Sequence, residues 1–271
     1  MTESLAVVAA VNDRAILQAN LAASPLLKKG DIGLIVEQGH KSAGAAYNAG
    51  MGRANADIVI FAHQDVYLPL GWERHLLGGI EKLKSRGCKW GVLGVYGIER
   101  TGEYAGRVWS SGLGRELGKH FDEPQEVVSI DELVIILLRA SQVFFDMELP
   151  GFHLYGTDIV QTAVGRGLGA YVIHAPVIHN SKPVISLGKS YWLAYRYTQK
   201  KWARALPIPT CIMPITPTNW QRWRYKISII REKIRRAKQK TGRYDNPKEI
   251  AQRLGYEPFR CVASIGKELP E

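Results

Sequence analysis

Short apolar runs and segments with helical spacing alternate along the first 65 residues, and this order restricts the fold more than any other feature. The apolar runs, rich in β-branched residues, span 5–11, 32–36 and 58–62, and the helical segments between them span 15–22 and 43–54. Neighbouring parallel strands need a crossover connection, which is usually a helix. The pattern therefore predicts an α/β fold with a mostly parallel sheet flanked by helices.

The alternation continues less regularly after residue 65. The spacing predicts helices over 71–84 and 157–166, and strands over 90–96, 133–138 and 170–178. Residues 97–125 are rich in glycine and show no period. They indicate a long irregular segment, and long segments of this kind are often functional.

Composition sets outer limits on the class of protein. Apolar residues make up 46% of the chain, enough for a large core, yet no apolar run approaches the length of a transmembrane helix. The N-terminal segment fits a first strand better than a signal peptide. The three cysteines are far apart and form no CxxC or Cys/His metal spacing, which is typical of a reduced, cytoplasmic protein.

The net charge of +11 is concentrated near the C-terminus, where residues 222–243 hold ten Lys/Arg and one Glu. Four prolines occur in 206–217, and apolar residues then recur at helical spacing over 220–234. We expect a main domain over 1–205 and, over 206–271, a Pro-rich linker with a basic amphipathic helical extension. The apolar stripe of 220–240 could pack on the main domain or lie on an anionic membrane surface.

Polar side chains follow each of the first three predicted strands. Asn12 and Asp13 follow the first, Glu37 the second, and His63-Gln64-Asp65 the third. In open α/β sheets, ligands bind in the crevice outside the carboxyl ends of the strands. We therefore predict a functional site at this edge of the sheet.

The helix and third strand carry a specific motif, whose matching residues are Ala46, Asn48, Gly50, Ala54, Asp57, Ile60, Phe61 and Asp65. Their order and spacing resemble family-2-type glycosyltransferases of the GT-A fold, in which A-x-N-x-G leads to a strand ending in D-x-D. Here His63 replaces the first acid, as in a bacterial subgroup with HQD. Residues 151–158 and 179–181 strengthen the resemblance, which covers 5–181, about two thirds of the chain.

The resemblance implies a GT-A-like (Rossmann-like) catalytic domain over 1–205. It implies transfer of a sugar from a UDP- or GDP-type nucleoside diphosphate sugar to an acceptor hydroxyl, with inversion. The implied acceptor is a glycan or lipid-linked glycan. The implied setting is bacterial polysaccharide or lipopolysaccharide assembly in the cytoplasm, peripheral to the inner face of the membrane.

A divalent metal, Mn²⁺ or Mg²⁺, follows from the same resemblance, because a cation offsets the charge that develops on a departing diphosphate. The ligands we expect are Asp65, His63 and His179. Imidazole suits Mn²⁺ better than Mg²⁺, which prefers oxygen ligands. Hydrogen bonding to a loop is the alternative role for either histidine.

Nucleotide-sugar contacts are expected from side chains near the strand ends: Asn12, Asp13, Glu37, Lys41, Asn48, His63, Gln64 and Asp65. Capping of the following helix is the alternative for Asn12 and Asp13. Bracing between helix and loop is the alternative for Asn48. Lys41 could simply be hydrated.

Inverting transfer needs a base that removes the proton of the acceptor hydroxyl. Asp158 is the first candidate, although similar enzymes carry an acid where this chain has Thr157. Its alternative role is a carboxylate at a helix N-terminus, and Asp131 is the second candidate base. Trp109 and His153 are candidate acceptor contacts, with core packing as the alternative for Trp109.

Other functional classes remain open. A non-catalytic nucleotide-sugar or glycan-binding module is compatible with the departures at His63 and Thr157. A dinucleotide oxidoreductase is disfavoured, because the G-x-G-x-x-G fingerprint is missing after the first strand. No nucleic-acid partner is expected, because no nucleic-acid-binding motif accompanies the basic charge.

Overall fold

The computed structural model describes residues 3–28, 30, 32–183, 186–218, 220, 221, 225 and 246–257. Its main sheet has the strand order β2-β1-β3-β11-β5-β12-β9. These strands are β2 (Gly33–Glu37), β1 (Leu5–Ala10), β3 (Ile58–Ala62), β11 (Val134–Leu138), β5 (Trp90–Gly94), β12 (Gly169–Val172) and β9 (Gln125–Glu126). Only β11 and β9 run against the others, so the sheet is mostly parallel, as predicted.

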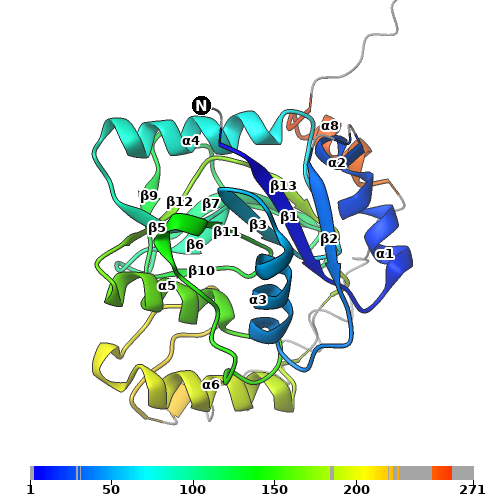
Figure 1. Cartoon of the computed structure of the whole chain (residues 1–271). Coiled ribbons are helices and arrows are strands. Elements are labelled where there is room, and N and C mark those ends of the chain that lie inside the picture. The colour runs from blue at the N-terminus through cyan, green and yellow to red at the C-terminus, as the bar shows by residue number, and fades with distance from the viewer. Residues whose placement is uncertain are drawn as a thin grey trace, which may run out of the picture.

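Helices cover both faces of the main sheet. They are α1 (Arg14–Ala19), α2 (Pro25–Lys28), α3 (Ala43–Arg53), α4 (Trp72–Ser85), α5 (Tyr155–Gly165) and α6 (Lys189–Lys201), with short 3₁₀ turns at Leu21–Ala23, Arg139–Ser141 and Ala203–Ala205. Figure 1 shows α4 on one side of the sheet, α3 and α5 on the other, and α6 beyond α5. The inner strands β1, β3, β11 and β5 are buried on both faces, which explains their continuous apolar sequences.

Successive side chains of each strand enter two different cores. Val8 and Phe61 pack with α3 and α5, whereas Val7 and Ile60 pack with α1 and α4. The small residues of α3 permit a close approach, since a Cβ on Gly50 would lie 2.3 Å from a methyl of Val8. Ser42 caps the N-terminus of this helix, because its hydroxyl accepts the amide N–H of residue 45.

A second sheet occupies much of the region expected to be irregular, so the prediction for 97–125 was wrong. Its order is β10-β6-β7-β13-β4, and β8 pairs with β7. The strands are β10 (Ser129–Ile130), β6 (Tyr96–Ile98), β7 (Tyr104–Ser110), β13 (Val177–His179), β4 (Val66–Tyr67) and β8 (Arg115–Gly118). The misleading glycines allow tight strand contacts: a Cβ on Gly106 would lie 2.3 Å from the Val95 carbonyl oxygen.

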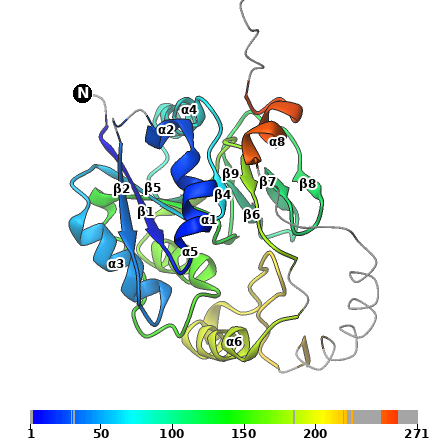
Figure 2. The same cartoon turned by 90° about the vertical axis from the view of Figure 1, so that its right-hand side faces the viewer.

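The last described element, α8 (Pro247–Arg253), packs on the second sheet although it belongs to the predicted extension. Ile250 and Tyr256 contact Trp109 and Ile178 in a third small core, and Figure 2 shows α8 beside β7 and β8. The division at residue 205 stays a prediction. Most of the basic segment 220–240 lies outside the described residues.

None of the helices within the described residues is both long and apolar enough to span a lipid bilayer.

Candidate active site

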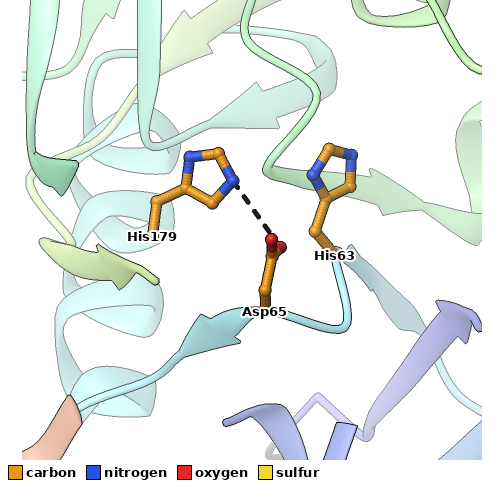
Figure 3. Close-up of side chains that lie close together, drawn as sticks. All are labelled: His63, Asp65 and His179. Carbon is orange, nitrogen blue, oxygen red and sulfur yellow. Dashed lines mark ion pairs between the residues drawn. The ribbon is translucent and has the colours of Figure 1, made fainter. Parts of the chain in front are cut away.

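Three side chains form a compact group at the carboxyl edge of the main sheet. His63 directly follows β3, Asp65 precedes β4, and His179 ends β13. One ligand atom of each lies within 4.8 Å of the others, and His179 Nε2 is 3.6 Å from Asp65 Oδ1 (Figure 3). The pairing of β13 with β4 creates this contact, because it sets His179 opposite Val66.

A tyrosine fixes the orientation of the His63 ring. Tyr155 Oη lies 2.7 Å from His63 Nε2 and donates its single hydrogen to the Glu132 carbonyl oxygen at 3.2 Å. This contact occupies His63 Nε2 and leaves Nδ1 as the nitrogen that could bind a cation. Figure 3 shows one ring nitrogen of His63 turned toward Asp65 and the other turned away.

Burial keeps His63 neutral, as a metal ligand must be. The loss of hydration lowers the pKa of His63, and the nearby Asp65 carboxylate opposes this shift only in part. A neutral imidazole whose other nitrogen is held by a hydrogen bond is the usual arrangement of a protein metal ligand. Two imidazoles and one carboxylate thus suit Mn²⁺ better than Mg²⁺.

A cleft of about 500 Å³ begins at this group and extends across the ends of the first three strands. Its volume is within the range of small-molecule sites. The lining residues with polar or aromatic side chains are Asn12, Glu37, Gln38, His40, Tyr47, His63, Gln64, Asp65 and Phe152. A second pocket lies at the opposite end of β1 and β2, away from His63, Asp65 and His179.

The predicted nucleotide residues at the first and third strand ends are tied together. Gln64 Oε1 accepts the backbone N–H groups of Asn12 and Asp13, and Gln64 Nε2 donates to Asn12 Oδ1 at 2.6 Å. The Asp13 carboxylate caps α1 by accepting the N–H groups of Ala15 and Ile16. Asp13 therefore has the capping role considered as its alternative, and Asn12 and Gln64 line the cleft as one hydrogen-bonded unit.

The other predicted nucleotide residues differ in position. Glu37 lines the cleft, where its two carboxylate oxygens bind His40 and Arg53 at 2.9 Å each. Asn48 braces α3 by exchanging two hydrogen bonds with the backbone of Phe145. Lys41 is exposed and is not among the residues that line the cleft. Glu37 is thus well placed to meet a ligand, whereas Asn48 has a bracing role.

Asp158 is buried and held by α6 and the residue that follows it. Lys201 Nζ lies 2.8 Å from Asp158 Oδ1, and Trp202 Nε1 donates to the same oxygen at 2.7 Å. Burial raises the pKa of Asp158, while Lys201 favours its charged form. The base role of Asp158 stays a prediction, and these contacts favour an anchoring role.

The acid beside Asp131 was missed in the sequence. Asp131 Oδ1 accepts the N–H of Leu133, whereas the backbone N–H groups of Leu154 and Gly156, at the start of α5, favour the charged form of Glu132. Burial raises the pKa of Glu132 to about 8, and the Asp131 charge adds to the shift. A carboxyl group with a strongly shifted pKa is a candidate for proton transfer.

The two predicted acceptor residues have different surroundings. Trp109 is 8% exposed and packs between β13 and α8, with Arg253 over its ring. It therefore has the core role considered as its alternative. His153 is half-buried, and its ring centroid lies 5.6 Å from that of Tyr191 on α6.

A second group of histidines lies elsewhere, around the segment between β12 and β13. His120 Nδ1 is 3.0 Å from His174 Nε2, and His120 Nε2 is 3.0 Å from Asp122 Oδ1. The His75 ring centroid lies 6.0 Å from that of His174. Within the described residues, this group does not bring three ligand atoms as close together as the His63 group does.

No known protein-family profile matches the chain. Among curated proteins, it is 29% identical over 136 residues to "ATP synthase subunits region ORF 6" of Fuscovulum blasticum, covering 49% of this chain and 55% of that protein. The chain thus matches only about half the length of this relative.

Solved glycosyltransferases share the architecture. The structure of GalNAc-T7 with UDP, GalNAc and Mn²⁺ matches with a TM-score of 0.51 and 12% identity, over 94% of this chain and 57% of that one. The mannosyltransferase PcManGT from Pyrobaculum calidifontis, in complex with GDP-Man and Mn²⁺, matches with a TM-score of 0.46 and 10% identity, over 94% and 80%. The likeness to GalNAc-T7 shows that the chain has a GT-A-like fold, as the sequence predicted.

Proposed function

We propose that this chain transfers a sugar from a nucleoside diphosphate sugar to an acceptor hydroxyl, with a divalent cation held by His63, Asp65 and His179. The observation that carries the proposal is the position of these three ligand atoms, within 4.8 Å of one another at the wall of a strand-end cleft. Oriented ligands beside a cleft of substrate size are the minimum that a metal-assisted transfer requires.

The donor would lie along the cleft with its diphosphate at the cation and its nucleoside toward Glu37. When bound, the cation would supply positive charge that stabilises the departing diphosphate. Glu37 can accept a hydrogen bond from a ribose hydroxyl or a base N–H, although His40 and Arg53 already bind it. The paired Asn12 and Gln64 side chains would keep the cleft in shape.

Inversion, a glycan or lipid-linked glycan acceptor, and a role in bacterial polysaccharide or lipopolysaccharide assembly belong to the proposal. Support for them comes from the sequence resemblance. The basic composition of 220–240 would suit attachment to an anionic inner membrane surface.

Thermal unfolding with nucleoside diphosphates tests the donor and metal parts of the proposal. UDP or GDP at 100 times its Kd should stabilise the folded state by about 2.7 kcal/mol. The stabilisation should depend on Mn²⁺ and should be lost in Asp65→Ala. The matched control is Asp122→Ala, because Asp122 is exposed and lies in the other histidine group. No stabilisation of the wild type by any nucleoside diphosphate would sink the proposal.

The rival function, a non-catalytic binding module, predicts the same binding without turnover. Release of UDP or GDP from UDP-glucose, UDP-galactose, UDP-N-acetylglucosamine or GDP-mannose distinguishes the two. Binding of a donor that is never cleaved, even with a panel of sugar acceptors, would favour the module.

A further inference from the structure

Glu132 is positioned by the start of α5. Its side chain lies against the first turn of this helix, where the backbone N–H groups of Leu154 and Gly156 favour the charged form of the carboxyl group. Gly156 is required for this approach, since a Cβ there would lie 2.5 Å from the Ile130 carbonyl oxygen and 3.3 Å from Glu132 Cγ. The helix start is therefore built around the segment that carries Glu132.

The same segment is joined to the candidate cation group through one side chain. The Tyr155 hydroxyl lies 3.2 Å from the Glu132 carbonyl oxygen and 2.7 Å from His63 Nε2. Only this tyrosine separates the backbone of Glu132 from the His63 ring. Tyr155 thus connects the segment that carries Glu132 to the candidate cation group.

Helix α6 carries a hydroxyl group, that of Tyr191, without a hydrogen-bond partner in the described part of the chain. Tyr191 is fully buried, and its hydroxyl has no hydrogen-bond partner among the described residues. The negative charge of Glu132 adds to the burial that raises the pKa of Tyr191, and the His153 ring lies 5.6 Å away. Buried hydroxyls nearly always have partners, so this one indicates a place for a bound hydroxyl or water.

The backbone conformation of Leu154, the residue between His153 and α5, also indicates a functional site here. It is buried and has a φ of 62°, although it is not a glycine. Side chains are held in the left-handed region only where surrounding contacts require it, and such residues gather at functional sites. This turn lies between His153 and the start of α5, against which the Glu132 side chain packs.

We propose that Glu132, Tyr191 and His153 form the subsite of the attacking hydroxyl, and that Glu132 is the base that removes its proton. This inference rests on the proposed transferase function. In the step, the acceptor oxygen forms a bond to the anomeric carbon while the bond from that carbon to the diphosphate oxygen breaks. The proton passes to the Glu132 carboxylate, and the electron pair leaves with the nucleoside diphosphate.

The rival carboxylate is less suited to the role. Asp158 is 1% exposed, and the Lys201 ammonium and the Trp202 indole N–H already occupy it. A base must reach the proton that it abstracts. Asp158 instead holds the C-terminal end of α6, the helix that carries Tyr191.

Several ionisable groups lie close enough to Glu132 to interact with its charge, and their ionisation could affect how the hydrolysis rate depends on pH. Asp131 is its nearest acid, and the remaining groups are Tyr47 on α3, Tyr155 on α5, Tyr191 on α6 and Cys211 in the proline-rich segment. The pKa values of the three tyrosines and of Cys211 are all raised, so these four groups stay neutral around pH 7. Glu132 is then the member expected to ionise near neutrality.

Donor hydrolysis, with water as acceptor, tests the inference without knowledge of the natural acceptor. The probes are UDP-glucose, UDP-galactose, UDP-N-acetylglucosamine and GDP-mannose with Mn²⁺, and the readout is release of the nucleoside diphosphate. Glu132→Gln should lower the rate by about 10²- to 10⁴-fold, the usual contribution of a general base. It should also remove the rise in rate with pH, while binding of the nucleoside diphosphate is unchanged.

Three further variants separate catalysis from folding. Glu126→Gln, at an exposed acid on β9, should behave as the wild type. Asp158→Asn should keep the pH profile and lower the melting temperature, because Lys201 loses one of its two carboxylate partners. Tyr191→Phe should slow hydrolysis several-fold yet melt no lower than the wild type, because it removes an unpaired buried hydroxyl.

The outcomes distinguish this inference from the proposed function. Turnover in Glu132→Gln within threefold of the wild type, or an unchanged rate in Tyr191→Phe, overturns the inference and leaves the transferase intact. Wild-type binding without cleavage of any of the four donors also overturns it. Failure of the wild type to bind any nucleoside diphosphate overturns the proposed function, and this inference with it.

Discussion

Two groups of histidine and aspartate lie in this molecule, and their differences show what a candidate metal site requires beyond composition. In the first, His63, Asp65 and His179 hold their ligand atoms within 4.8 Å of one another. In the second, His120 and His174 face each other directly at 3.0 Å, and Asp122 binds the far side of His120. The residue types are the same, and the arrangement of the ring nitrogens differs.

The hydrogen bonds of the second group form a chain that uses the ring nitrogens internally. His120 Nε2–H donates to Asp122, so His120 Nδ1 must accept from His174 Nε2–H. His174 Nδ1 then carries a lone pair, which is buried and has no partner among the described residues. In the first group, by contrast, Tyr155 takes the far nitrogen of His63 and leaves Nδ1 turned toward Asp65.

The largest difference between the two groups should appear when the aspartate of each is replaced by asparagine. Asp65→Asn removes the only carboxylate of the first group and should lower Mn²⁺-dependent donor cleavage by roughly 10³-fold, because a metal supplies several kcal/mol of charge stabilisation. Asp122→Asn, the matched change in the second group, should leave the rate within twofold. The measurement is release of nucleoside diphosphate at saturating donor. Equal losses in the two variants would remove the distinction between the groups.

The hydrogen bond from Tyr155 should have the next largest effect. Tyr155→Phe removes the hydroxyl that contacts His63 Nε2 and should weaken Mn²⁺ binding about 10- to 100-fold, as the loss of a group that orients a metal ligand usually does. Calorimetric titration with Mn²⁺ in the presence of UDP or GDP measures the change. Tyr104→Phe is the control, since Tyr104 is 51% exposed and lies on β7. An unchanged affinity in Tyr155→Phe would show that the Tyr155 hydroxyl does not orient His63.

The positions of His63 and Asp65 could be predicted because the apolar run before them shows where the strand ends. The apolar run before His63 is continuous and buried, so the end of the strand and the edge of the sheet follow from the pattern. His179 was predicted as a ligand from its place after another strand. Its actual approach depends on the pairing of β13 with β4, a contact across more than a hundred residues.

The roles of the acids were harder to predict, because distant contacts decide them. Asp158 follows a recognisable motif, yet Lys201 and Trp202 from another part of the chain bind it. Glu132 stands beside the predicted Asp131, and only the folded start of α5 brings up the two backbone N–H groups that favour its charged form. The second sheet was missed because its glycines, such as Gly106, resemble those of a loop.

A stability effect of intermediate size is expected from His174. Burial and the neighbouring histidines lower the pKa of His174 from 6.5 to about 4, so the unfolded chain binds the proton more readily. Stability should therefore be unaffected above pH 6.5 and should fall as the pH drops from 6.5 toward 4. For a half-buried ring, screening by solvent reduces the loss to about 1–2 kcal/mol.

Urea unfolding of His174→Gln at pH 7 and pH 5 isolates this contribution. The difference in unfolding free energy between the two pH values should be smaller in the variant than in the wild type. His153 lies in the proposed acceptor site and His40 lines the cleft, so Lys89→Gln, at an exposed side chain, serves as the control. An identical pH dependence in wild type and His174→Gln would show that His174 ionises normally.

The smallest effect should come from His120, whose side chain is 60% exposed. His120→Ala should change the unfolding free energy by no more than about 0.5 kcal/mol at pH 7, because surface substitutions rarely do more. It should also leave the affinity for Mn²⁺ within twofold, since the second group offers no third ligand atom at close range. His179→Ala is the matched change in the first group and should weaken Mn²⁺ binding at least tenfold. A comparable loss in His120→Ala would mean that Mn²⁺ is held where the two histidines meet, and that the closer spacing of the first group does not select the cation.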